Sequence, residues 1–194
     1  KKKLNQLLIR LLKSNLFLIF GLKKVLEWIF FQWVLIYYKF KKELSQNKDS
    51  LIFIHGSGES SFVWKKQLQE LNLKNDIIAI DLPSHGNSDH YADLSLELYT
   101  KAIKELKEQL NLESLILCGH SLGGAIALNY YFNNQDDVSG LILMSTGAKL
   151  RVLPVILHNT INEFPTFLQN VPIGAFYRKT DDKIYTPLAA GEMM

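Results

Sequence analysis

The sequence predicts an α/β fold in which helices flank a mostly parallel sheet. Short apolar segments of strand-like composition alternate with segments that carry apolar residues at helical spacing. This alternation is typical of a parallel sheet that is covered on both faces. Polar and glycine-rich turns follow the apolar segments, which is where the chemistry of such sheets collects. The length of 194 residues favours one sizeable core over two domains.

Five segments are predicted to be strands. The first is β-branched and aromatic, and the others are short runs of almost entirely apolar residues. The segments are residues 34–40, 51–54, 77–80, 115–118 and 141–144.

Three stretches between these strands are predicted to be helices. Trp64, Leu68 and Leu71 recur at helical spacing, and residues 125–131 are apolar on nearly every side. Ser95 is the expected N-cap of the remaining helix. The apolar stripe of that helix consists of Leu98, Ala102, Ile103, Leu106 and Leu110.

The fourth predicted strand runs directly into Gly119-His120-Ser121-Leu122-Gly123, and a helix opening follows. A strand, a tight turn and a helix in this order make G-x-S-x-G indicate a nucleophile elbow. Glycines two residues either side of Ser121 remove the Cβ atoms that would collide with so sharp a turn. The sequence therefore predicts Ser121 as a nucleophile, with the N–H of Leu122 pointing into the same space. The alternative is a glycine-rich turn that only starts a packed helix.

Four turns are expected to meet at one edge of the sheet, because the carboxyl ends of parallel strands lie together. They comprise residues 55–58, residues 81–89, Ser121 and residues 145–147. Their convergence is a more specific signal than any one of the motifs.

The single cysteine excludes an internal disulfide and fits a reducing compartment such as the cytoplasm. Cys118 ends an apolar strand, so we expect a small core residue and not a second nucleophile. No Cys/His cluster has metal-ligand spacing, and neither a metal nor an organic cofactor is expected.

Residues 1–33 differ from the rest of the chain. Residues 1–42 hold ten Lys or Arg residues and one acid, although the whole chain has a net charge of only +3. The segment is basic, aromatic and interrupted by charges, which favours attachment of residues 1–38 to a membrane surface. The alternatives are a spanning helix or packing on the sheet. Bulky aliphatic residues between the charges argue against nucleic acid.

Three motifs resemble those of the α/β-hydrolase superfamily, in its serine-nucleophile, esterase- and lipase-like form. His55-Gly56-Ser57-Gly58 is similar to the H-G-x-G oxyanion loop, and residues 119–123 are similar to the elbow. Residues 81–89 resemble the D-x-x-G-x-G-x-S loop, with Ser84 where the family often has glycine.

The resemblance implies that Ser121 attacks an acyl substrate, a small ester-type molecule. The N–H groups of Ser57 and Leu122 would then form the oxyanion hole, and Gly56, Gly119 and Gly123 would be the glycines of the loop and elbow. It implies that His55 shapes the loop and that His120 is an ordinary elbow residue. Asp81 is expected to form the turn at a strand end.

The resemblance also predicts the domain organisation. Residues 1–33 are the N-terminal segment, residues 34–150 the hydrolase core, and residues 151–194 the start of a helical cap. In the family, the triad acid and histidine follow two later strands. Only His158 comes after Ser121, in the cap segment, and Asp136, Asp137, Asp181 and Asp182 are expected to be surface charges. We therefore expect a chain truncated before its acid and histidine, neither of which the sequence identifies.

Two alternatives to hydrolysis stay open. One is a non-catalytic, membrane-associated protein that uses a degenerate hydrolase fold, and the other is acyl transfer on the same residues. The sequence indicates no oligomeric state.

Overall fold

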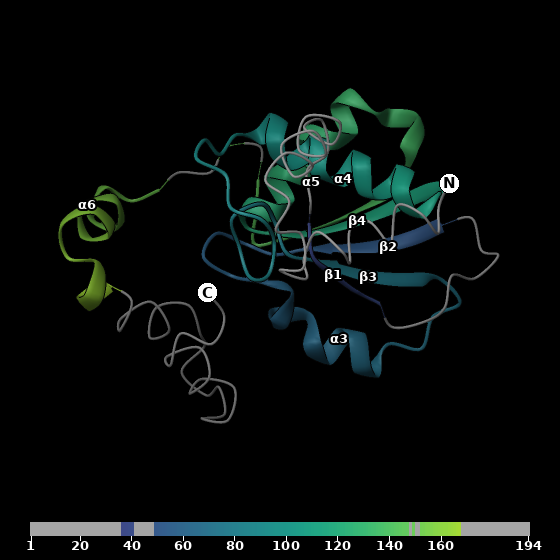
Figure 1. Cartoon of the computed structure of the whole chain (residues 1–194), viewed down its shortest axis with the longest axis horizontal. Coiled ribbons are helices and arrows are strands. Elements are labelled where there is room, and N and C mark those ends of the chain that lie inside the picture. The colour runs from purple at the N-terminus through teal and green to yellow at the C-terminus, as the bar shows by residue number, and fades with distance from the viewer. Residues whose placement is uncertain (1–35, 41–48, 148, 150–151, 168–194) are drawn as a thin grey trace, which may run out of the picture. The chain divides into compact units, whose positions relative to one another are not determined.

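A computed structural model describes residues 36–40, 49–147, 149 and 152–167 (Figure 1). Within this part of the chain, five strands form one sheet in the order β1-β3-β2-β4-β5. Strand β1 is antiparallel to β3, and all other neighbours are parallel. The predicted α/β class with a mostly parallel sheet is therefore confirmed. The strands are β1 (Tyr38–Phe40), β2 (Asp49–Ile54), β3 (Asp76–Ile80), β4 (Ser114–His120) and β5 (Val138–Met144).

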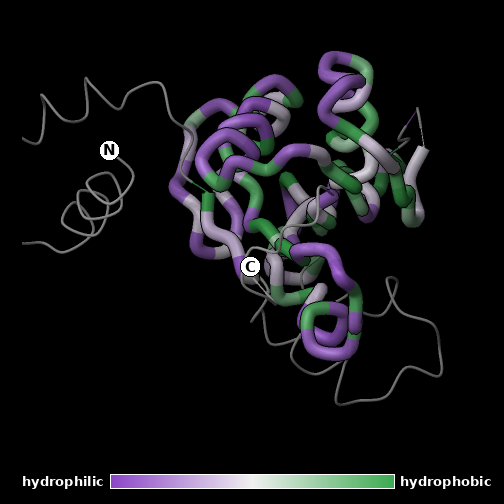
Figure 2. The backbone as a smooth tube through the Cα atoms, turned by 90° about the vertical axis from the view of Figure 1, so that its right-hand side faces the viewer, coloured by the Kyte–Doolittle hydropathy of each residue, from purple (hydrophilic) through white to green (hydrophobic). Residues whose placement is uncertain are grey.

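Helices cover the central strands on both faces. Figure 1 shows α4 and α5 on one side of the sheet and α3 on the other. In Figure 2 the tube carries both hydrophilic and hydrophobic residues along its helical coils. The helical elements are η1 (Ser61–Trp64), α3 (Lys65–Glu70), α4 (Leu96–Leu110), α5 (Leu122–Asn133), η2 (Gln135–Asp137) and α6 (Pro154–Asn162).

The core lies in two layers because successive side chains of a strand point to opposite faces. On β2, Ile52 and Ile54 belong to the cluster that includes residues of α4 and α5. Leu51 and Phe53 belong to the second cluster, where the Phe53 ring stacks on Trp64 with centroids 4.6 Å apart. The central strands are thus buried on both faces, as their continuous apolar composition predicts.

Helix α4 begins where its capping residue predicts. The Oγ of Ser95 accepts a hydrogen bond from the N–H of Leu98 at 3.1 Å, which satisfies one unpaired donor of the first turn. Asn111 ends the helix in the left-handed conformation. The predicted stripe faces the sheet, with Ala102, Ile103 and Leu106 almost fully buried.

The edge strand β5 differs from the expectation of a sheet covered on both faces. The last three residues of β5 are exposed: Ile142 by 46%, Leu143 by 43% and Met144 by 42%. The first strand also differs, because β1 begins only at Tyr38. Residues 34–35 of the predicted strand lie outside the described residues.

The predicted N-terminal segment, residues 1–33, lies outside the described residues, and its attachment to a membrane stays a prediction. In the described ranges, no helix combines the length and the hydropathy needed to cross a membrane. Of the predicted cap region, the structure describes residues 152–167, which contain α6.

Candidate active site

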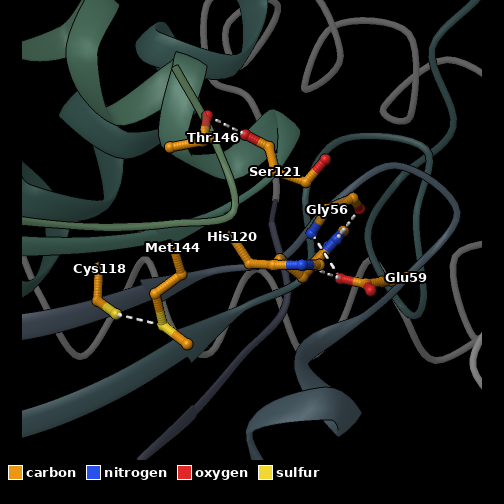
Figure 3. A network of polar contacts seen from close by, with 8 residues as sticks. Gly56, Glu59, Cys118, His120, Ser121, Met144 and Thr146 are labelled. Carbon is orange, nitrogen blue, oxygen red and sulfur yellow. Dashed lines mark hydrogen bonds and ion pairs between the residues drawn. The ribbon is translucent and has the colours of Figure 1, made fainter. Parts of the chain in front are cut away.

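Ser121 lies in the turn between β4 and α5, in a backbone conformation that non-glycine residues rarely adopt. Its φ is 50° and its ψ is −115°. Two hydrogen bonds hold Ser121 in this conformation. Its N–H donates to the carbonyl oxygen of Met144, the last residue of β5, at 2.9 Å. Its carbonyl oxygen accepts from the Oγ1 of Thr146 at 2.7 Å (Figure 3). Such a strained residue marks a candidate functional site.

Glycine is required around Ser121 because the main chain packs on itself. A Cβ added to Gly119 would overlap the backbone of Gly123, one turn of chain away. A Cβ added to Gly124 would overlap the side chain of Thr146. The turn can therefore be this tight only with glycine at these positions; the motif predicts this for Gly119, and the requirement at Gly124 comes from the structure.

Residues 55–58, the predicted oxyanion loop, lie beside this turn because β2 and β4 are neighbours. Ile54 pairs with Gly119 in the parallel register, so the segments after both strands leave the sheet together. A Cβ on Gly56 would stand 3.3 Å from the Cβ of Ser121. Along the described chain, neither the N–H of Ser57 nor that of Leu122 donates a hydrogen bond. The structure thus brings the predicted residues of the site together.

His55 is buried and forms hydrogen bonds through both ring nitrogens. Its Nε2 accepts from the N–H of Leu82 at 3.0 Å, so its Nδ1 carries the proton and donates to the carbonyl oxygen of Gly56 at 2.7 Å. Burial lowers the pKa of His55 to about 4, which keeps the ring neutral at pH 7. Both nitrogens are occupied, in agreement with a role in shaping the loop.

Asp81 links two turns at the same edge of the sheet. The fully buried side chain accepts from the N–H of Ser61 at 2.6 Å through Oδ1 and from the N–H of Asn87 at 2.8 Å through Oδ2. It therefore joins the start of η1 to the loop after β3. This agrees with the predicted role of a turn-forming residue at a strand end.

Glu59 and His120 form a contact that the sequence did not predict. The Oε2 of Glu59 accepts from the N–H of Gly56 at 2.7 Å and lies 3.1 Å from the Nδ1 of His120 (Figure 3). The hydrogen bond to Glu59 raises the pKa of His120. Burial alone would raise the pKa of Glu59, but its bonds to His120 and Gly56 outweigh burial and lower it. The only hint of this contact in the sequence is that an acid, Glu59, directly follows residues 55–58.

Cys118 is a core residue, as predicted. Its side chain is buried within β4, two residues before the strand ends, and its Sγ lies 3.9 Å from the Sδ of Met144. Burial raises the pKa of the thiol to about 11, so the reactive thiolate is scarce at neutral pH.

No described histidine contacts the hydroxyl of Ser121. His158 is exposed on α6, where its Nδ1 lies 3.3 Å from the Nδ2 of Asn162. The described residues also contain no group of three or more His, Cys, Asp or Glu arranged to hold a metal ion. Among the described residues, no hydrogen bond therefore links Ser121 to a histidine as in a Ser-His-Asp triad.

One of the predicted surface charges has a structural role. Asp137 accepts from the buried hydroxyl of Tyr130 at 2.9 Å and forms an ion pair with Lys107 at 2.8 Å. These bonds join α4, α5 and η2. Asp137 is thus a partly exposed charge with structural partners, because the neighbouring helices bring a donor and a cation to it. Asp136 is exposed, and residues 181 and 182 lie outside the described residues.

The comparisons with known proteins agree with the fold. The chain is 31% identical over 116 residues to YugF, an uncharacterized hydrolase of Bacillus subtilis, an alignment that covers 58% of this chain and 42% of that protein. It is similar in structure to Est816, an N-acyl homoserine lactone degrading enzyme (TM-score 0.72, 22% identity, 81% of this chain and 62% of that one). It is also similar to a thermophilic esterase (TM-score 0.64, 28% identity, 80% and 62%).

The chain spans less than two thirds of the length of each of these proteins. The family model described as alpha/beta hydrolase fold matches residues 49–191, which is most of the chain. The protein therefore belongs to the alpha/beta hydrolase fold family.

Proposed function

We propose that the protein hydrolyses a small ester-type acyl substrate, with Ser121 as the nucleophile. The observation that carries the proposal is the strained backbone of Ser121, which stands at the carboxyl edge of the sheet next to two N–H groups without partners in the described chain. The similarity to a thermophilic esterase and to a hydrolase of Bacillus subtilis supports ester chemistry.

In the proposed reaction, the Oγ of Ser121 attacks the carbonyl carbon of the ester. The carbonyl oxygen becomes an oxyanion, which accepts hydrogen bonds from the N–H groups of Ser57 and Leu122. The C–O bond to the alcohol then breaks, and the alcohol leaves with a proton. Water attacks the acyl-enzyme, releases the acid and restores Ser121. Both N–H groups favour the transition state because negative charge develops on the oxygen that they face.

A base must accept the Ser121 proton, and neither histidine near the site is suited to this task. Both nitrogens of His55 are occupied, and its lowered pKa makes it a weak base. The Nδ1 of His120 is engaged by Glu59. All five histidines of the sequence lie among the described residues, and none of them has a hydrogen bond to the Ser121 hydroxyl. In keeping with the order Ser…Asp/Glu…His, we propose that the base is a histidine beyond these 194 residues.

The test is hydrolysis of p-nitrophenyl acetate by the wild-type protein and by Ser121→Ala. Removing the nucleophile of a triad costs about 10³-fold or more in kcat. Ser139→Ala is the matched control, because Ser139 is an exposed serine at the start of β5. We expect Ser121→Ala to lose its turnover and Ser139→Ala to keep it. Equal turnover in the wild type and in Ser121→Ala would rule out the nucleophile.

A further inference from the structure

We infer, on the basis of the proposed function, that Glu59 is a positioning residue: by binding Gly56 and His120 together it sets where the N–H of Ser57 lies relative to Ser121. The observation behind this inference is one carboxylate oxygen shared by two donors, one in the oxyanion loop and one in the elbow, residues 119–123.

Only one of the first two N–H groups of the loop is left for the substrate. The N–H of Gly56 is committed to the Oε2 of Glu59 at 2.7 Å, so it cannot serve an oxyanion. The next N–H along the loop, that of Ser57, has no partner in the described chain. Because each peptide unit is planar, anchoring the unit that carries the N–H of Gly56 leaves only φ and ψ of Gly56 to set the direction of the N–H of Ser57.

The loop fits closely against the elbow. A Cβ on Gly56 would stand 3.0 Å from the Oε2 of Glu59, 3.1 Å from the Nδ1 of His120 and 3.3 Å from the Cβ of Ser121. Gly56 therefore occupies a corner formed by these three side chains. A change in the pair between Glu59 and His120 would therefore shift Gly56, and with it the distance between the N–H of Ser57 and the side chain of Ser121.

The acceptor that joins the loop to the elbow is a carboxylate, that of Glu59. Hydrogen bonds to a charged acceptor are shorter and stronger than those to a neutral one. The side chains of Glu59 and His120 are 24% and 34% exposed, so water partly screens the pair. The pair is therefore suited to fixing geometry more than to adding stability. The other titratable group that acts on Glu59 is His55, which is neutral at pH 7.

The inference predicts a loss of kcat in Glu59 variants of the full chain. Removing a donor from an oxyanion hole costs about 10²–10³-fold in kcat, and misplacing one costs less. We expect kcat for p-nitrophenyl acetate to fall about 10-fold in Glu59→Gln and up to about 100-fold in Glu59→Ala, with KM little changed. Glu70→Gln, which alters an exposed acid at the end of α3, is the matched control.

A second readout, NMR on the same proteins, does not depend on turnover. The pKa of His120, raised in the wild type, should fall in Glu59→Gln, and the amide resonances of Gly56 and Ser57 should shift. Glu59→Gln keeps the size of the side chain, so it serves if Glu59→Ala fails to fold.

The outcomes separate this inference from the proposed function. An active wild type with unchanged kcat in Glu59→Gln and Glu59→Ala overturns the inference alone, even if the pKa of His120 falls. An inactive wild type overturns the proposed function. The spectra then decide: unmoved resonances of Gly56 and Ser57 in Glu59→Gln overturn the positioning role, and shifted ones support it.

Discussion

Gly123 lies against the main chain of Ile54, so closely that a Cβ added to the glycine would overlap the carbonyl oxygen of Ile54. This contact joins the first turn of α5 to the end of β2. It is the reason why Ser121 and the oxyanion loop can share one corner of the sheet.

Gly123→Ala is therefore expected to destabilise the fold. The added methyl group meets backbone atoms, which cannot rotate away, and overpacking of this kind costs about 1–3 kcal/mol or more. Gly140→Ala is the control, because a Cβ on Gly140 would make ordinary contacts of 3.6 Å with the side chain of Ile116. Urea unfolding measures both variants. Equal midpoints for Gly123→Ala and the wild type would contradict the close approach.

Asp81→Asn is expected to be destabilising because both carboxylate oxygens of Asp81 accept hydrogen bonds from backbone N–H groups. An amide of the same shape would direct an NH₂ group at one of these donors. An unsatisfied buried donor costs about 1–3 kcal/mol. Asp89→Asn, on an exposed side chain of the same loop, should change stability by less than about 0.5 kcal/mol. Thermal unfolding distinguishes the two, and equal melting temperatures would refute the role of Asp81.

The buried His55 should make the protein less stable in acid. Burial lowers the pKa of His55 from 6.5 in the unfolded chain to about 4 in the folded one. Between these values the unfolded chain binds the proton and the folded chain does not, so stability falls as the pH is lowered through this window. The shift corresponds to a loss of about 3 kcal/mol.

The measurement is the free energy of unfolding between pH 7 and pH 4. His55→Gln cannot take up the proton, so its stability should change less with pH than that of the wild type. His90→Gln, at an exposed position, should follow the wild-type profile. A wild-type profile retained by His55→Gln would show that another group causes the acid sensitivity.

The parts of the fold that the sequence predicted correctly are those with local signals. The apolar runs predicted strands β2, β3 and β4 because burial on both faces demands such composition, and the same kind of run predicted β5 although its last three residues are exposed. Ser95 marked the start of α4 through its capping chemistry. The elbow was predictable because its turn requires glycines at fixed positions around Ser121.

The contacts that the sequence analysis missed join residues from different elements. Glu59 meets His120, 61 residues away, only because β2 and β4 are neighbours in the sheet. Asp137 meets Lys107 because α4 packs near the end of α5. Strand order and helix packing decide such pairs, and no pattern within one segment contains that information.

The central claim, that Ser121 is a nucleophile activated by its place in the fold, is tested most directly by fluorophosphonate labelling followed by peptide mass spectrometry. We predict one adduct, on Ser121, in the folded protein, and none on Ser121 after denaturation in urea. An adduct on another serine alone, or equal labelling of Ser121 in the folded and denatured chains, would contradict the account.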